Sequence, residues 1–129
     1  MLDGTLGDLH LQLGANMHKL IILVETPEDL NTFDDLWPQF LHHAEGMPGL
    51  TREATSRIES VIFGNNSYYL IHELFFDSLQ AIQAAMRSDP GQSAGEVLQR
   101  MTDGRMVLLM ADHKEDSMEN ILKSKAEPE

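Results

Sequence analysis

The chain of 129 residues contains no cysteine. This absence excludes disulfides, thiolate nucleophiles and thiolate metal ligands, and it is typical of a cytoplasmic protein. Basic residues are also scarce, since 9 Lys and Arg stand against 21 Asp and Glu, leaving a net charge of -12. Binding to a phosphate backbone requires clustered positive charge, so we expect no nucleic-acid partner.

Long apolar runs are missing as well. No segment approaches the roughly 20 consecutive apolar residues that a membrane-spanning helix needs. Asp3 and Asp8 stand where a signal peptide would be basic. We therefore expect a cytoplasmic protein without a membrane partner, and the length suits one domain around a single core.

Three shorter apolar segments predict strands. Residues 19–25, 68–76 and 105–111 have few polar interruptions, which is typical of strands covered on both faces. The segment 50–63 alternates and is more polar, as expected of a strand near a sheet edge. The turn residues at 64–67 then predict a tight hairpin between the second and third strands.

Between these strand segments, apolar residues recur at helical spacing. This spacing predicts a helix over 28–45, with a kink or a division into two helices at Pro38. Asp77, followed by Gln80, predicts a capping box at the start of a second helix. The turn at 88–91 interrupts that helix, and a short amphipathic helix is expected after Ser117.

The order β-α-β-β-α-β predicts an α+β, ferredoxin-like fold with a four-stranded antiparallel sheet and helices on one face. We expect an N-terminal extension (1–16), a ferredoxin-like domain (17–112) and a charged C-terminal tail (113–129). Within the extension, residues 9–13 alternate, which allows either a short edge strand or a loose segment. Because three of the strands do not alternate, the second sheet face must also be covered. A second copy is the simplest cover, so we expect a homodimer.

His72 and Glu73 are the most interesting ionisable pair, because neighbours on a strand face opposite sides. A hairpin centred on 65–66 would place Glu59 opposite His72 and Ile58 opposite Glu73. Glu73 in apolar company would have a raised pKa and act as a catalytic acid or base, or else serve as a buried structural carboxylate. For His72 we favour a structural pair with Glu59 across the strands.

His42 and His43 are adjacent on the first predicted helix. Their side chains point about 100° apart, so they cannot chelate one metal together. Either one reaches a pocket as a general base, or both lie at the partly exposed helix end and interact with its dipole. No other histidine has ligand-like spacing, so we expect no metal and no cofactor.

Several aromatic residues are candidates for lining an apolar ligand cavity, and core packing is the alternative for each. Together with His72, the candidate ligand-binding residues are Trp37, Phe40, Tyr68, Tyr69 and Phe75.

Four segments resemble motifs of the EthD family, which is associated with ethyl tert-butyl ether degradation. They are Met47-Pro48-Gly49-Leu50, the run from Glu73 to Ala81, Ser88-Asp89-Pro90-Gly91-Gln92, and the run from Val107 to Ala111. The resemblance implies a homodimer whose two sheets close a barrel, a dimeric α+β barrel, with a small-molecule pocket between sheet and helices. Many members carry Trp-x-x-x-His in the first helix. Here Trp37 is followed by Leu41 at that position, and the histidines come one and two residues later.

Two functions fit these observations. The first is a small-molecule-binding or accessory protein of a degradation pathway, holding an apolar metabolite between sheet and helices. The alternative is a cofactor-free enzyme, of the proton-transfer or monooxygenase type, with Glu73, His42 or His43 as acid and base. An enzyme should bring two ionisable side chains to one ligand atom, whereas a binder should have an apolar lining with polar groups at the mouth.

Overall fold

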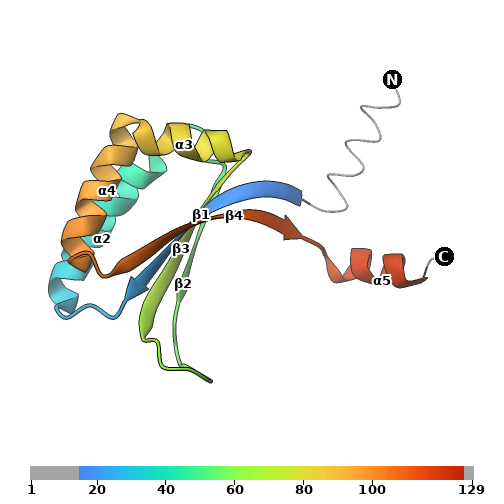
Figure 1. The fold of residues 1–129 in the computed structure, drawn as a ribbon, viewed down its shortest axis with the longest axis horizontal. Coiled ribbons are helices and arrows are strands. Elements are labelled where there is room, and N and C mark those ends of the chain that lie inside the picture. Colours follow the sequence, from blue (N-terminus) through green and yellow to red (C-terminus); the bar gives the residue numbers. More distant parts are fainter. Residues whose placement is uncertain (1–14, 127–129) are drawn as a thin grey trace.

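The computed structural model describes residues 15–126, which form one antiparallel sheet with helices (Figure 1). The sheet has the strand order β2-β3-β1-β4. Its strands are β1 (Ala15–Glu25), β2 (Arg52–Arg57), β3 (Tyr68–Phe76) and β4 (Met106–Glu115). The helices are α2 (Leu30–Glu45), α3 (Leu79–Arg87), α4 (Asp89–Thr102) and α5 (Met118–Ala126). The predicted α+β, ferredoxin-like fold is confirmed.

Helices α2, α3 and α4 cover one face of the sheet, whereas α5 lies on the other side, beyond the end of β4 (Figure 1). The core fills the space between the sheet and the three helices. Because side chains alternate along a strand, every second residue of β1 and β3 enters this core. The buried strand residues on the face toward these helices are Leu20, Ile22, Val24, Leu70, His72, Leu74 and Phe76. In residues 15–126 no helix is long and apolar enough to cross a membrane.

Helix α2 runs through Pro38 as one helix, so the predicted alternative of two abutting helices is wrong. Pro38 removes one backbone donor, which frees the carbonyl four residues earlier, at Asp34. Both residues lie on the exposed side of α2, where water can satisfy that carbonyl. The helix begins at Asp29, whose side chain accepts hydrogen bonds from the backbone N–H groups of Asn31 and Thr32.

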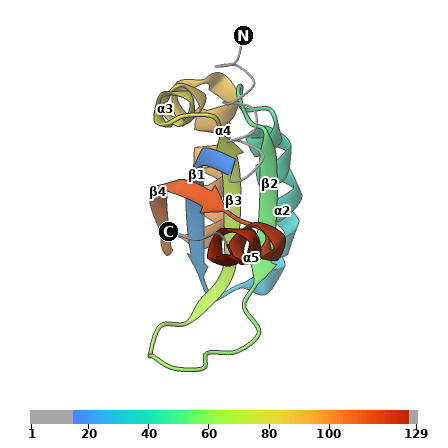
Figure 2. The same cartoon turned by 90° about the vertical axis from the view of Figure 1, so that its right-hand side faces the viewer.

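The pairing of β2 with β3 differs from the predicted one. Strand β2 ends at Arg57, and residues 58–67 form a long loop that extends beyond the sheet, instead of a tight hairpin (Figure 2). Thr55 therefore stands opposite His72 where Glu59 was expected, a shift of four residues, and Ala54 stands opposite Glu73. An even shift keeps every side chain on its predicted face, so only the partners change.

Two element boundaries also differ. Ser78 caps α3 by accepting a hydrogen bond from Ala81 N–H, so the predicted capping box starting at Asp77 is wrong. Strands β1 and β4 are longer than predicted, and they pair from Ala15 with Glu115 to Val24 with Met106. The candidate edge strand at 9–13 lies outside the described residues.

The junction of α3 and α4 depends on a glycine. A Cβ atom at Gly91 would lie 2.1 Å from the carbonyl oxygen of Ala85 and 2.9 Å from that of Met86. Ser88 holds the same turn, because its hydroxyl accepts from Gly91 N–H and donates to Ala85 O. At Gly95, one turn later in α4, an added Cβ would meet nothing within 4 Å.

We predict opposite effects for two matched substitutions, Gly91→Ala and Gly95→Ala, on the free energy of unfolding in urea. Gly91→Ala should lower it by about 1–3 kcal/mol, because the two helices must separate to admit the methyl group. Gly95→Ala should raise it by about 0.5–1 kcal/mol, since alanine is favoured over glycine in a helix. Equal effects from the two substitutions would contradict the close approach at Gly91.

Candidate functional site

A polar cluster lies beneath α2, where β2 meets β3. His72 is fully buried there, and its Nδ1 lies 2.8 Å from Thr55 Oγ1, which identifies a hydrogen bond. Its Nε2 lies 3.0 Å from Glu53 Oε1. These last two atoms are not aligned for a hydrogen bond, and both are buried without one among residues 15–126. We call Glu53 and His72 the buried pair.

Aromatic rings surround the imidazole of His72. The rings of Trp37 and Phe40, both from α2, meet it edge-on with centroids 5.3 Å and 5.7 Å away. Phe33 stacks on Trp37 at 5.7 Å and meets Tyr69 edge-on at 5.4 Å. Three predicted ligand-binding residues, Trp37, Phe40 and His72, are thus in mutual contact, and Tyr69 adjoins them through Phe33.

Burial sets the protonation of the pair. Desolvation lowers the pKa of His72 to about 4, against the opposing charges of Glu45 and Glu73. Desolvation also raises the pKa of Glu53 to about 7, helped by the hydrogen bond and the negative charge of Glu45. Near neutral pH the imidazole is therefore uncharged, and Glu53 exists in both protonation states. A carboxyl group with such a pKa can give or take a proton at physiological pH.

An apolar cavity of about 230 Å³ adjoins the aromatic cluster, between the sheet and α4. Small residues of α4 leave room for it, namely Gly91, Ala94 and Gly95. Among residues 15–126, Gln92 supplies the one polar side chain in its lining. The other lining residues are Leu20, Ile22, Phe40, Met47, Leu74, Met86, Leu98 and Leu108.

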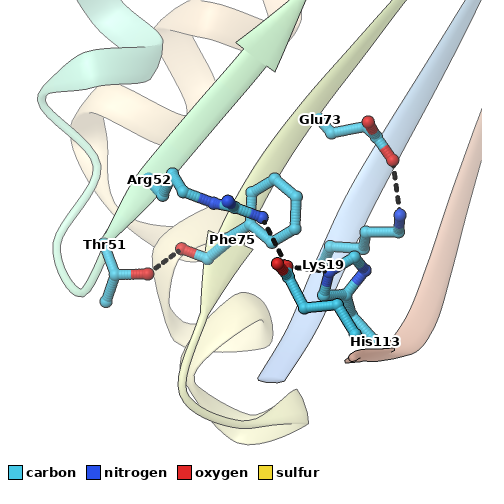
Figure 3. Close-up of polar contacts among 7 residues, drawn as sticks. Lys19, Thr51, Arg52, Glu73, Phe75 and His113 are labelled. Carbon is cyan, nitrogen blue, oxygen red and sulfur yellow. Dashed lines mark hydrogen bonds and ion pairs between the residues drawn. The ribbon is translucent and has the colours of Figure 1, made fainter. Parts of the chain in front are cut away.

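Glu73 lies on the opposite face of the sheet, with Lys19 as its partner. The Lys19 Nζ and Glu73 Oε2 atoms are 2.5 Å apart, and both side chains are largely buried (Figure 3). This ion pair explains how a carboxylate is tolerated in a nearly apolar strand. The sequence suggested apolar surroundings for Glu73, but the structure provides a lysine from β1.

Phe75 lies on the same face of the sheet as Glu73, the face that α2, α3 and α4 leave uncovered, which we call the open face. Polar side chains bury its ring there. The Arg52 guanidinium carbon lies 4.0 Å from the ring centroid, and the His113 ring meets Phe75 edge-on at 4.9 Å (Figure 3). Glu115 joins the two neighbours, with an oxygen 3.1 Å from Arg52 and 2.7 Å from His113. Phe75 is thus remote from the cavity, on the other side of the sheet.

The remaining predicted residues are dispersed. His42 is exposed and His43 is half-buried in the last turn of α2, with their ring centroids 5.4 Å apart. Tyr68 is half-buried at the start of β3, opposite Glu25. Within residues 15–126, no group of three or more His, Asp and Glu side chains could hold a metal ion.

The sequence reasoning missed Glu53 and Thr55 as partners of His72. A signal for them existed, because Glu53, Thr55 and Glu59 are separated by even numbers of residues and so share a face. Only the length of the loop after Arg57 decides which of the three stands near His72, and that length was not evident from the turn residues at 64–67.

The raised pKa of Glu53 predicts a pH-dependent effect of Glu53→Gln. Glu53 has a higher pKa when folded than its ordinary 4.5, so its stabilising contribution is present below pH 4.5 and is lost as the pH rises through about 7. Glutamine stays neutral throughout. Relative to the wild type, the variant should therefore gain stability between pH 5 and pH 8. His72 remains in both proteins, so its opposite contribution cancels.

Urea unfolding at the two pH values measures this difference. Glu59→Gln is the matched control, because Glu59 is exposed in the loop 58–67 and should show no such gain. A pH-independent difference between the Glu53→Gln variant and the wild type would contradict the assigned protonation.

The fold is shared with several proteins of known structure. No protein-family model and no curated protein matches the sequence. A dimeric ferredoxin-like protein of unknown function from Thermobifida fusca is similar over 76% of this chain and 92% of its own, with a TM-score of 0.60 and 13% identity. SnoaB, a cofactor-independent oxygenase from Streptomyces nogalater, is similar over 80% of this chain and 95% of its own, with a TM-score of 0.54 and 8% identity. Similarity at such identity shows a shared fold.

A third structure is much more similar. It is an ethyl tert-butyl ether degradation (EthD) family protein from Bacillus halodurans C-125, with a TM-score of 0.69 and 30% sequence identity. The match covers 75% of this chain and 98% of that chain. Nearly the whole length of that protein is therefore represented in the present chain, which belongs to the EthD family.

Proposed function

We propose that the protein binds a small apolar molecule in the cavity between its sheet and α4, as a binding or accessory protein of a degradation pathway. The apolar lining of the cavity is the observation that carries this proposal. A binder is expected to have an apolar interior with polar groups at its mouth. The lining matches that pattern, since Gln92 is exposed and the other lining side chains are apolar.

The size of the cavity limits the ligand. Ligand pockets usually measure about 300–1,000 Å³, and this one is smaller, at about 230 Å³. A molecule of one or two rings is therefore the expected occupant. Met47 and Met86 in the lining have flexible side chains that can adapt to its shape.

Filling the cavity tests this proposal. In Leu98→Phe the added ring should occupy the cavity and weaken the binding of naphthalene at least tenfold, a loss of about 1.4 kcal/mol. Isothermal titration calorimetry measures the affinity, and urea unfolding checks that the fold is kept. The control is Val97→Ile, which enlarges a neighbouring core residue outside the lining. Unchanged naphthalene affinity in the Leu98→Phe variant would argue against the cavity as the binding site.

We further propose a homodimer in which two copies pair through the open sheet faces and close an α+β barrel. The centre of that face is apolar in all of its long strands, with Ile21 and Leu23 in β1, Ile71 in β3, and Val107 and Leu109 in β4. Such a surface favours association over exposure to water. The proposal is supported by the related structures, because the Thermobifida fusca protein is dimeric.

A charge at the centre of the open face should prevent this association. We expect Leu109→Asp to halve the mass measured by light scattering at micromolar concentration, because the carboxylate would be buried without a partner. Leu30→Asp is the matched control. Leu30 and Leu109 are similarly exposed, at 47% and 44%, but Leu30 lies on α2 and not on the open face. A wild-type monomer, or dissociation by both variants, would contradict the proposed interface.

A cofactor-free enzyme is the second candidate function, and the buried pair is the observation that favours it. Glu53 has a pKa of about 7, which suits general acid–base catalysis. SnoaB, which shares the fold, is a cofactor-independent oxygenase. Glu73, His42 and His43 remain candidate acid and base residues under this alternative, but none of them is among the residues that line the cavity.

A further inference from the structure

We infer that the cavity and the buried pair form one ligand site, which takes a neutral aromatic alcohol. The ring system would fill the cavity, and its hydroxyl group would lie to one side of His72 Nε2 and Glu53 Oε1, within hydrogen-bond reach of both atoms. This inference rests on the proposed binding function and adds the chemical class of the ligand.

Strand pairing places the cavity and the buried pair side by side on one face of the sheet. Leu74, which lines the cavity, stands opposite Glu53, and Ile22, also in the lining, stands opposite His72. Directly paired residues share a face, and neighbouring strands lie about 4.8 Å apart. A ring in the cavity is therefore about one strand spacing from the buried pair.

Phe40 is the partition between the two parts. Its ring lines the cavity and also contacts the ring of His72, with centroids 5.7 Å apart. This aromatic side chain of α2 therefore borders both the apolar space and the imidazole. A rotation of that side chain would join the two into one space.

The buried pair has an unused capacity for hydrogen bonding. His72 Nε2 and Glu53 Oε1 are both buried and without a hydrogen bond among residues 15–126, which is uncommon for buried polar atoms. The inference requires the tautomer of the neutral imidazole that carries its proton on Nε2, in which Thr55 Oγ1 donates to Nδ1. That N–H can donate to a hydroxyl oxygen, and the hydroxyl can donate in turn to Glu53. One hydroxyl group therefore satisfies both atoms.

Charge selects a neutral ligand. Glu45 and Glu53 interact directly, and the chain as a whole carries a net charge of -12. A carboxylate or phenolate next to these two acids would be repelled. An ammonium group fits no better, because it has no lone pair to accept the hydrogen bond from His72 Nε2–H.

The test compares 2-naphthol with naphthalene, two probes that differ by one hydroxyl group, in calorimetric titrations of the full chain. The wild type should bind 2-naphthol about tenfold more tightly. In Glu53→Leu the acceptor is lost, and this preference should fall to about threefold or less. Glu59→Leu, in the exposed loop, is the matched control and should keep the tenfold preference.

Nuclear magnetic resonance gives a second readout. In 15N-labelled wild-type protein, 2-naphthol should shift the imidazole nitrogen resonances of His72, and naphthalene should shift them much less. Equal affinity of the wild type for both probes, or a preference that survives in Glu53→Leu, would overturn the inference while leaving the proposed binding function intact. Failure of both probes to bind would overturn both.

Discussion

The antiparallel pairing of β1 with its neighbours is the constraint on which the rest of the structure depends. β1 lies between β3 and β4 and pairs with them over almost its whole length. Because side chains alternate along each strand, this pairing gives every residue of the inner strands a definite face. Leu20, Ile22 and Val24 enter the core, and Lys19 emerges on the other side to meet Glu73.

The same alternation separates two adjacent ionisable residues in β3. His72 enters a layer of aromatic rings, where burial keeps the imidazole neutral, whereas Glu73 is balanced by a lysine on the open face. The core therefore holds an imidazole whose Nδ1 is hydrogen-bonded to Thr55 of the edge strand, and Glu53 of the same strand lies beside its Nε2. An edge strand is a suitable place for such partners, because one of its sides remains open to solvent.

Much of the fold could be predicted from local patterns. The apolar runs at 19–25 and 68–76 and the interruption at 88–91 all correspond to observed elements, since strand and turn signals of this kind depend on nearby residues. Two predictions of local detail were wrong. Pro38 does not divide α2 into two helices, and water can satisfy the carbonyl that it frees on the exposed side; Ser78 caps α3 in place of Asp77.

The sequence by itself determined the fold class, through the order of its strand and helix signals, and four motifs resembled those of the family. It also determined the separation of His72 from Glu73 onto two faces, because period-two alternation needs no knowledge of distant contacts. Tertiary structure decided which side chains pair with His72 and with Glu73. A long loop after Arg57 brings Thr55, not Glu59, to His72, and pairing with β1 supplies Lys19 to Glu73. These outcomes depend on loop length and strand register. Both are set by how the whole core packs, and no short stretch of residues encodes them.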